Sequence, residues 1–192
     1  MKRLAASLQA ETIVQKLILN GEHLSAALGQ AIATCRHRLF IATADVKNLH
    51  IPLPAPARGR RTARSVVDVL DELGRRGVEV RLLHSGVPSG SFLAAFKSRL
   101  PHGLVMRRCV RIHAKIVCAD GKWMYLGSAN LTGAGLGAKS PRRRNFEAGV
   151  WTDETAIIDP VMDMLQSIWD GTRCTSCGRK EHCPVPLEEP AL

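Results

Sequence analysis

The stretch HAKIVCADGKWMYLGSAN, from His113 to Asn130, is the part of the sequence that decides the fold. Apolar residues flank Ala119-Asp120-Gly121 on both sides, and an Asp-Gly pair favours the tight turn of a β-hairpin. The pattern predicts strands over residues 112–118 and 122–127. Alternate side chains of a strand share a face, so we expect His113 and Lys115 to point the same way.

The polar residues of this stretch suit phosphoryl transfer. A histidine can attack phosphorus through one ring nitrogen while a carboxylate holds the other, and a lysine offsets the charge that builds on the phosphoryl oxygens. His113 and Lys115 are such a pair. The turn Gly127-Ser128-Ala129-Asn130 adds a hydroxyl and an amide close to backbone N–H groups, which are groups that hold phosphate.

Together these residues resemble the HxK(x4)D(x6)GSxN signature of the phospholipase D superfamily. The resemblance extends over roughly residues 30–170, and Asn145-Phe146-Glu147 is similar to the Asn-x-Glu that follows the signature in the family. It implies an α/β fold with a mixed sheet flanked by helices, and a phosphodiesterase (hydrolase) activity that needs no catalytic metal. It also implies a role for each residue of the motif.

In this resemblance His113 is the nucleophile that becomes a phosphohistidine, and Glu147 orients its imidazole. Lys115 and Asn130 bind the phosphate. Two further residues have supporting parts: Ser128 as a phosphate contact or a simple turn residue, and Asp120 as a brace for the hairpin.

The family normally brings two such motifs together, one histidine attacking while the other protonates the leaving oxygen. This chain has one motif, because no other histidine is followed by a lysine two positions on: His23, His37, His50, His84, His102 and His182. The resemblance therefore implies a symmetric homodimer in which both copies contribute to one site.

The hydrophobic periodicity outside the motif also predicts an α/β chain. A strand, a helix and a strand in succession, at 39–46, 64–75 and 78–83, imply a parallel pair. We expect further helices over 3–19, 24–35, 90–99 and 154–169, and further strands over 104–110 and 146–151. Residues 1–170 are predicted to form the catalytic domain, and residues 171–192 a Cys-rich tail.

The charge of the chain favours an anionic partner. Lysine and arginine number 27 against 17 acidic residues, a net charge of +10, with a pI of about 9.8. Nucleic acid, DNA or RNA, fits best, although anionic lipid headgroups would also attract such a protein. Two basic loops could line a nucleic-acid groove or could simply be solvated, with these arginines: Arg58, Arg60, Arg61, Arg142, Arg143 and Arg144.

The chain has no run of the roughly 18 to 20 apolar residues that a membrane-spanning helix needs. Polar residues interrupt the N-terminal segment, so we expect no secretory signal, a cytoplasmic location and no stable membrane association.

The tail carries Cys174, Cys177 and Cys183 in a C-x2-C-x5-C pattern. Such spacing is typical of metal ligation, and the sequence predicts one structural centre, zinc or a 4Fe-4S cluster, the second because the triplet resembles that of iron–sulfur nucleases related to the RecB family. The fourth ligand stays open among His182, Cys35, Cys109 and Cys118, and three unligated thiols are the alternative.

We therefore predict a homodimeric nuclease. A phospholipid-hydrolysing phospholipase D is the enzyme alternative. A third possibility is a catalytically weak nucleic-acid-binding module of a DNA-processing or defence complex.

Overall fold

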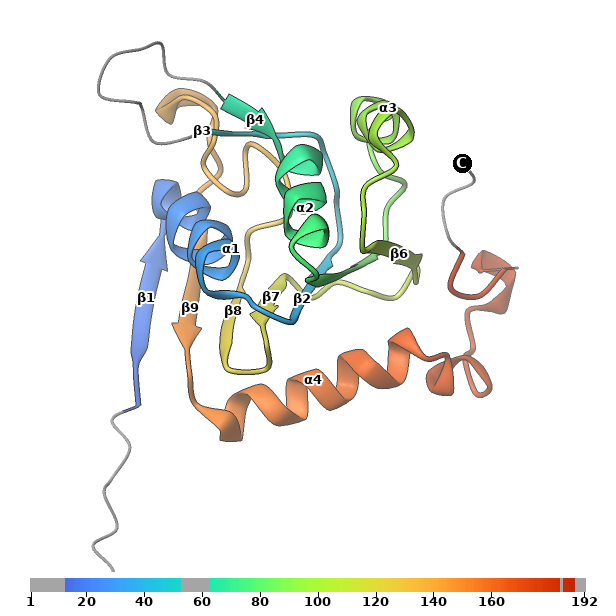
Figure 1. Cartoon of the computed structure of the whole chain (residues 1–192). Coiled ribbons are helices and arrows are strands. Elements are labelled where there is room, and N and C mark those ends of the chain that lie inside the picture. Colours follow the sequence, from blue (N-terminus) through green and yellow to red (C-terminus); the bar gives the residue numbers. More distant parts are fainter. Residues whose placement is uncertain (1–12, 53–62, 184, 189–192) are drawn as a thin grey trace, which may run out of the picture.

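The computed structural model describes residues 13–52, 63–183 and 185–188, and a mixed sheet of seven strands lies at its centre (Figure 1). The order across the sheet is β1-β9-β8-β7-β2-β5-β6. The strands are β1 (Gln15–Leu19), β2 (Arg38–Thr43), β5 (Glu79–His84), β6 (Leu104–Arg108), β7 (Ile116–Ala119), β8 (Trp123–Gly127) and β9 (Ala148–Thr152).

The strand directions confirm the predicted mixed sheet. β2, β5 and β6 run parallel to one another, and the other neighbouring pairs are antiparallel. Helix α2 (Val66–Arg75) connects β2 to β5, as the strand–helix–strand pattern predicts, and the hairpin β7–β8 turns at Asp120 and Gly121.

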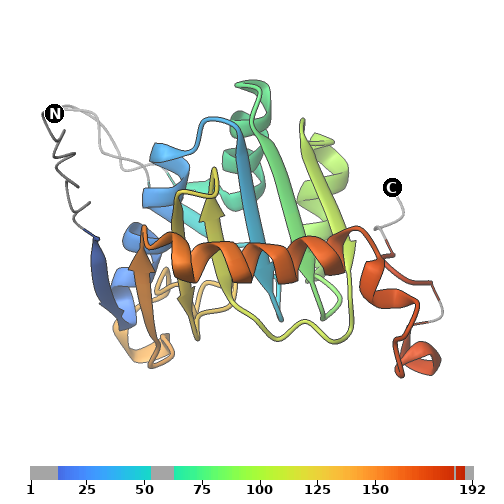
Figure 2. The same cartoon turned by 90° about the horizontal axis from the view of Figure 1, so that it is seen from below.

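Helices cover both faces of the sheet. α1 (Gln30–Thr34), α2 and α3 (Gly90–Arg99) lie on one face, and α4 (Thr155–Trp169) crosses the other alone (Figures 1 and 2). Each face has its own hydrophobic cluster, the larger one under α1 to α3. Serine side chains cap two of the helices: Ser65 Oγ accepts from Val67 N at 3.1 Å, and Ser89 Oγ from Phe92 N at 3.3 Å.

The N-terminal prediction is wrong where it can be compared. Residues 15–19 form the edge strand β1, not the end of a helix, and the rest of the predicted helix lies largely outside the described residues. β1 pairs antiparallel with β9, and Ile18 enters the core while the other four residues of the strand stay exposed. Cross-strand pairing overrides the helical spacing of the leucines.

A second difference concerns the motif. β7 begins at Ile116, so His113 and Lys115 precede the strand, and their predicted alternation on one strand face is wrong. Most other boundaries shift by one to three residues, as is usual for element ends. Two short paired strands, β3 (His50–Pro52) and β4 (Ala63–Ser65), flank the first of the two basic loops, whose residues 53–62 the structure does not describe.

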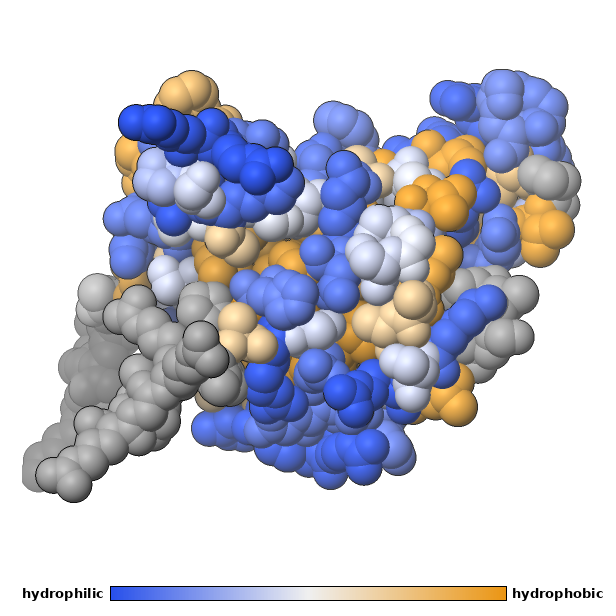
Figure 3. All heavy atoms as spheres, turned by 90° about the horizontal axis from the view of Figure 1, so that it is seen from above, coloured by the Kyte–Doolittle hydropathy of each residue, from blue (hydrophilic) through white to orange (hydrophobic). Residues whose placement is uncertain are grey.

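The face that carries α1 to α3 is largely hydrophilic, with smaller hydrophobic patches (Figure 3). No helix in the described ranges is long and apolar enough to cross a membrane. Three large aromatic residues are buried in the core, Tyr125, Trp151 and Trp169, and Trp123 is partly buried against it.

Candidate active site

His113 and Lys115 lie on an irregular segment, residues 109–115, that connects β6 to β7. The His113 side chain is exposed, whereas Lys115 is only 7% exposed. Lys115 Nζ lies 3.2 Å from His113 Nε2 and donates to the His113 carbonyl oxygen at 2.6 Å. The two functional groups are therefore in contact, although they do not alternate on a strand.

The environment of Lys115 affects its charge. Burial lowers the pKa of the ammonium group, and the negative charge of Glu147 acts in the opposite direction. Glu147 therefore acts electrostatically on Lys115.

Glu147 directly precedes β9 and is 8% exposed. Its carboxylate accepts from Ser128 Oγ, and from Asn145 Nδ2 at 3.0 Å. Its backbone is held by Asn20, whose N–H donates to Glu147 O at 2.8 Å and whose Oδ1 accepts from Glu147 N at 3.2 Å. Within the described chain no hydrogen bond joins Glu147 to His113, so its orienting role stays a prediction.

The turn after β8 is tied to the segment before β7. Gly127 N donates to the Lys115 carbonyl oxygen at 3.1 Å, and Ser128 Oγ accepts from Ala148 N at 3.0 Å. The two halves of the motif are thus joined through backbone groups at one end of the sheet.

Asn130 is fixed by the end of β2. Its Oδ1 accepts from Ala44 N at 3.1 Å, from Asp45 N at 3.2 Å and from the buried Thr43 hydroxyl at 3.2 Å. With the amide oxygen occupied, the NH₂ group is what Asn130 has to offer an anion.

Asp120 lies at the opposite end of β7 from His113 and Lys115. Its carboxylate accepts from the N–H groups of Arg36, His37 and Arg38, each at 2.8 Å, where the chain enters β2. Partial burial opposes the charged form, but these hydrogen bonds outweigh it and hold the pKa of Asp120 below its usual value. The geometry agrees with a bracing part for Asp120 and separates it from the reacting groups.

Tyr125 supports the turn that follows β8. It is fully buried, and its hydroxyl accepts from Ala129 N at 3.3 Å. A Cβ at Gly127 or Gly149 would overlap the Tyr125 ring or its hydroxyl. Both glycines are therefore needed for the close packing of β8 and β9 beside this side chain.

One of the two basic loops can be placed. Arg142 and Arg143 are exposed in a short turn, Pro141–Arg143, that leads into Asn145 and Glu147. Arg144 instead donates to the Lys139 carbonyl oxygen and packs over Gly21. Three further arginines predicted to bind nucleic acid lie outside the described residues: Arg58, Arg60 and Arg61.

The tail leaves α4 and consists of short turns. Its three cysteines are half-buried and unpaired. The pKa of Cys174 is raised by partial burial and by the nearby thiols Cys109, Cys183 and Cys177. The pKa of Cys177 is lowered by the Arg179 N–H and by Arg111, whose Nη1 donates to its sulfur at 3.6 Å.

Sequence reasoning missed several contributors. Thr43 positions Asn130, and Asn20 positions the Glu147 backbone, yet neither belongs to a recognisable pattern because each acts across more than 80 residues of chain. The contact of Asn145 with Glu147 could be predicted from the sequence, because both residues belong to the Asn-x-Glu segment. Phe146, between Asn145 and Glu147, is 96% exposed. The one indication of its exposure in the sequence is that it is an apolar residue between two polar motif residues.

The chain is similar to known proteins in sequence and in fold. The family described as cardiolipin synthase, PLD-like domain, matches residues 28–169. That span covers most of the chain, and the protein belongs to this phospholipase-D-like family. No curated protein matches the sequence.

Solved structures show the same fold. Nuc from Salmonella typhimurium, a phospholipase D family member, superposes with a TM-score of 0.62 at 15% identity, over 94% of this chain and 100% of that one. NucT from Helicobacter pylori gives 0.59 at 16% identity, over 81% and 95%. The archaeal chromatin protein TrmBL2 gives 0.51 at 11% identity, over 82% and 53%.

Proposed function

We propose that this protein is a nuclease that hydrolyses phosphodiester bonds of nucleic acid through a covalent phosphohistidine at His113. The observation that carries the proposal is the 3.2 Å contact between His113 Nε2 and Lys115 Nζ, beside the Ser128–Asn130 turn. A phosphate oxygen bound to the ammonium is thereby placed next to the attacking nitrogen.

The reaction then has two steps. An imidazole nitrogen of His113 attacks phosphorus, the bond from phosphorus to the leaving oxygen breaks, and that oxygen takes a proton from a second imidazolium. In the second step water gives a proton to the second imidazole, its oxygen bonds to phosphorus, and the N–P bond breaks. The products are an alcohol and a phosphate monoester.

The second imidazole is the reason to propose a homodimer. The chain has one HxK motif, so the partner subunit's His113 would serve as the acid. Its approach requires an interface centred on the end of the sheet that carries Lys115 and Glu147. Phe146, 96% exposed at that end, is an apolar residue that a second copy would cover.

Nucleic acid is favoured over phospholipid as the substrate by charge. The chain carries a net charge of +10, and Arg142 and Arg143 are exposed next to the segment that holds Glu147. Phosphate contacts from arginines supply much of the affinity for nucleic acid.

The test compares purified wild type and His113→Ala on single- and double-stranded DNA, on RNA and on phospholipid vesicles. We expect cleavage of at least one nucleic acid by wild type, and a loss of at least about 1,000-fold in the variant, because it lacks the nucleophile. His37→Ala is the matched control, an exposed histidine at the opposite end of the sheet. Cleavage of vesicle lipid alone would show that the protein is a phospholipase. Binding of nucleic acid without cleavage would show that it is a catalytically weak binding module.

Mixing tests the dimer. Wild type and His113→Ala are mixed in equal amounts and allowed to exchange subunits. The mixture should have about a quarter of the activity of wild type at the same total protein concentration, because only one dimer in four contains two copies of His113. Mixing with His37→Ala should leave the activity unchanged. Phe146→Ser should lower the concentration-dependent dimer fraction in sedimentation. An active wild-type monomer would refute the composite site, and an intact dimer that binds nucleic acid less tightly would make Phe146 a contact for a base instead.

A further inference from the structure

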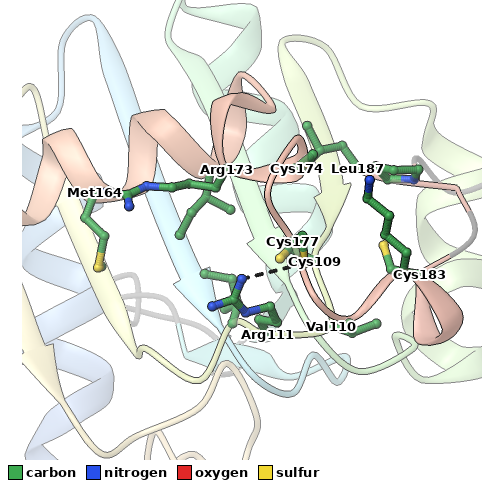
Figure 4. Close-up of a pocket in the computed structure, with 13 residues that line it drawn as sticks. Cys109, Val110, Arg111, Met164, Arg173, Cys174, Cys177, Cys183 and Leu187 are labelled. Atoms are coloured by element: carbon green, nitrogen blue, oxygen red, sulfur yellow. Dashed lines mark hydrogen bonds between the residues drawn. The ribbon is translucent and has the colours of Figure 1, made fainter.

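Four of the six cysteines line one pocket, a cavity of about 340 Å³ between the tail, α4 and the segment after β6 (Figure 4). Three come from the tail, Cys174, Cys177 and Cys183, and the fourth is Cys109. The other two cysteines are buried elsewhere. Cys35 lies against Asp120, and Cys118 packs in the cluster under α4. The fold therefore distinguishes among the cysteines of the body that the sequence could not rank.

We propose that Cys109, Cys174, Cys177 and Cys183 bind one thiophilic metal centre, a zinc ion or an iron–sulfur cluster. Four thiolates are a complete ligand set for either centre. The remaining ligand candidate, His182, adjoins Cys183 in the chain and is exposed, and it does not line the pocket.

Charges around the pocket suit a centre of this kind. Four thiolates on a divalent ion carry an excess of two negative charges, and three cationic residues line the cavity: Arg111, Arg173 and Lys180. Arg111 already donates to the Cys177 sulfur at 3.6 Å. Outer hydrogen bonds to sulfur stabilise bound thiolates and orient them.

The ligands are not yet gathered as they stand. Among residues 13–52, 63–183 and 185–188, no three His, Cys, Asp or Glu side chains lie close enough to hold one ion. The tail consists of short turns with mostly exposed side chains, so a small movement toward Cys109 disrupts little packing. Metal binding should accordingly order the tail, as it does in small domains whose core is too small to fold unaided.

The position of Cys109 connects this centre to the candidate active site. Cys109 is the first residue of the segment 109–115, and its N–H donates to the His84 carbonyl oxygen at 2.8 Å. The same segment carries Arg111, bonded to Cys177, and then His113. A metal bound to Cys109 would hold the start of the segment that presents the nucleophile. This consequence rests on the proposed nuclease function, whereas the metal centre does not.

The first measurement is metal content. The full chain, purified anaerobically in reducing buffer and dialysed, is analysed for zinc, iron and acid-labile sulfide. One zinc per chain in a colourless protein, or iron and sulfide in equal amounts in a brown protein, supports the centre and identifies it. Protein with neither metal would overturn the proposal.

The second measurement assigns the fourth ligand. Cys109→Ser should lose most of the metal and melt at lower temperature, and Cys177→Ser, on the exposed tail, should do the same with less risk to the body of the fold. Cys118→Ala, outside the pocket, should keep the metal. Full metal content in Cys109→Ser would exclude Cys109 as a ligand.

Activity is measured separately. If metal-depleted Cys177→Ser cleaves nucleic acid several-fold more slowly than wild type, the link to the segment 109–115 is supported, and an unchanged rate refutes that link. Wild type that contains metal but cleaves no substrate would refute the nuclease proposal and leave the metal centre standing.

Discussion

The connecting segment 109–115 begins beside the cysteine tail and ends at the proposed catalytic end of the sheet, where His113, Lys115, Asn130 and Glu147 lie. Different forces hold these two regions. At the catalytic end, Asn130 accepts hydrogen bonds from the last residue of β2 and from the two residues after it, and Glu147 accepts from Ser128 and Asn145. The buried Tyr125 hydroxyl accepts from Ala129 N in the turn beside them. In the part of the tail that the structure describes, short turns carry mostly exposed side chains, and the contacts with the body include the ion pair Arg108–Glu188, with N···O 3.0 Å.

The difference indicates how each region tolerates change. Strand pairing and burial define the catalytic geometry before any ligand arrives, so single substitutions there should remove function while the fold survives. The tail has little apolar area to bury, and its order should depend on what its cysteines bind. Four predictions test this contrast, beginning with the largest effect.

Lys115→Ala should lower kcat/KM by roughly 100- to 1,000-fold, because one preorganised cationic donor to the phosphoryl oxygens is lost. Steady-state kinetics on the preferred nucleic acid measure the loss, and circular dichroism checks the fold. Lys122→Ala, an exposed lysine at the far end of the hairpin, is the control and should retain wild-type rates. Equal rates for the two variants would remove Lys115 from the site.

Glu147→Gln should lower kcat by roughly 100-fold, the lower end of what a general acid–base contribution supplies. The glutamine keeps the size of the side chain but removes the charge that acts on Lys115. The pH profile of kcat should therefore change together with its height. A uniform drop with an unchanged profile would mean that Glu147 acts only through packing.

Asp120→Asn should destabilise the fold by about 1 to 2 kcal/mol, because hydrogen bonds to a charged acceptor exceed those to a neutral one. Asparagine also tolerates the positive φ of 55° at this position. The pKa of Asp120 is lowered in the folded state, so its stabilisation is present above the unfolded value of about 3.9 and disappears as the pH falls through the folded pKa.

Denaturant melts at pH 7 and at pH 3 measure this difference, which should shrink at the lower pH. Asp159→Asn, exposed on α4, is the control. A kcat reduced in Asp120→Asn as strongly as in Lys115→Ala would contradict the separation of this residue from the reacting groups.

EDTA should have the smallest effect. Attack by histidine with lysine as the counter-charge uses no divalent ion, so initial rates in a short assay with EDTA should stay within about twofold of those without it. The metal that we propose for the tail would be held by thiolates too tightly to leave in that time. Loss of activity that magnesium restores would indicate a metal-dependent nuclease instead.

The sequence predicts that the two halves of the motif lie close together, because the spacing of the motif follows from the pairing of β7 with β8. His113 and Lys115 precede β7, Ser128 and Asn130 follow β8, and antiparallel pairing brings these ends together. What spacing cannot predict is orientation: Lys115 is buried and His113 is exposed, and their contact depends on an irregular turn.

Elsewhere the missing information is long-range. The leucines at 17 and 19 fit a helix locally, and only pairing with β9 makes them part of a strand. The role of Thr43 depends on a contact 87 residues away in the chain. Cys109 lies beside the tail because β6 ends where α4 delivers the chain into the tail. No local pattern of residues predicts that arrangement.

The length of strand β7 sets the spacing between two polar residues of the motif. Its four residues, Ile116–Ala119, separate Lys115, which we propose to bind phosphate, from Asp120, which holds the start of β2 at the far end of the sheet. Substitutions within the strand change only packing, but insertion or deletion of one residue would turn every following side chain to the opposite face. Among related proteins, substitutions in β7 should thus be common, whereas insertions and deletions in this strand should be absent.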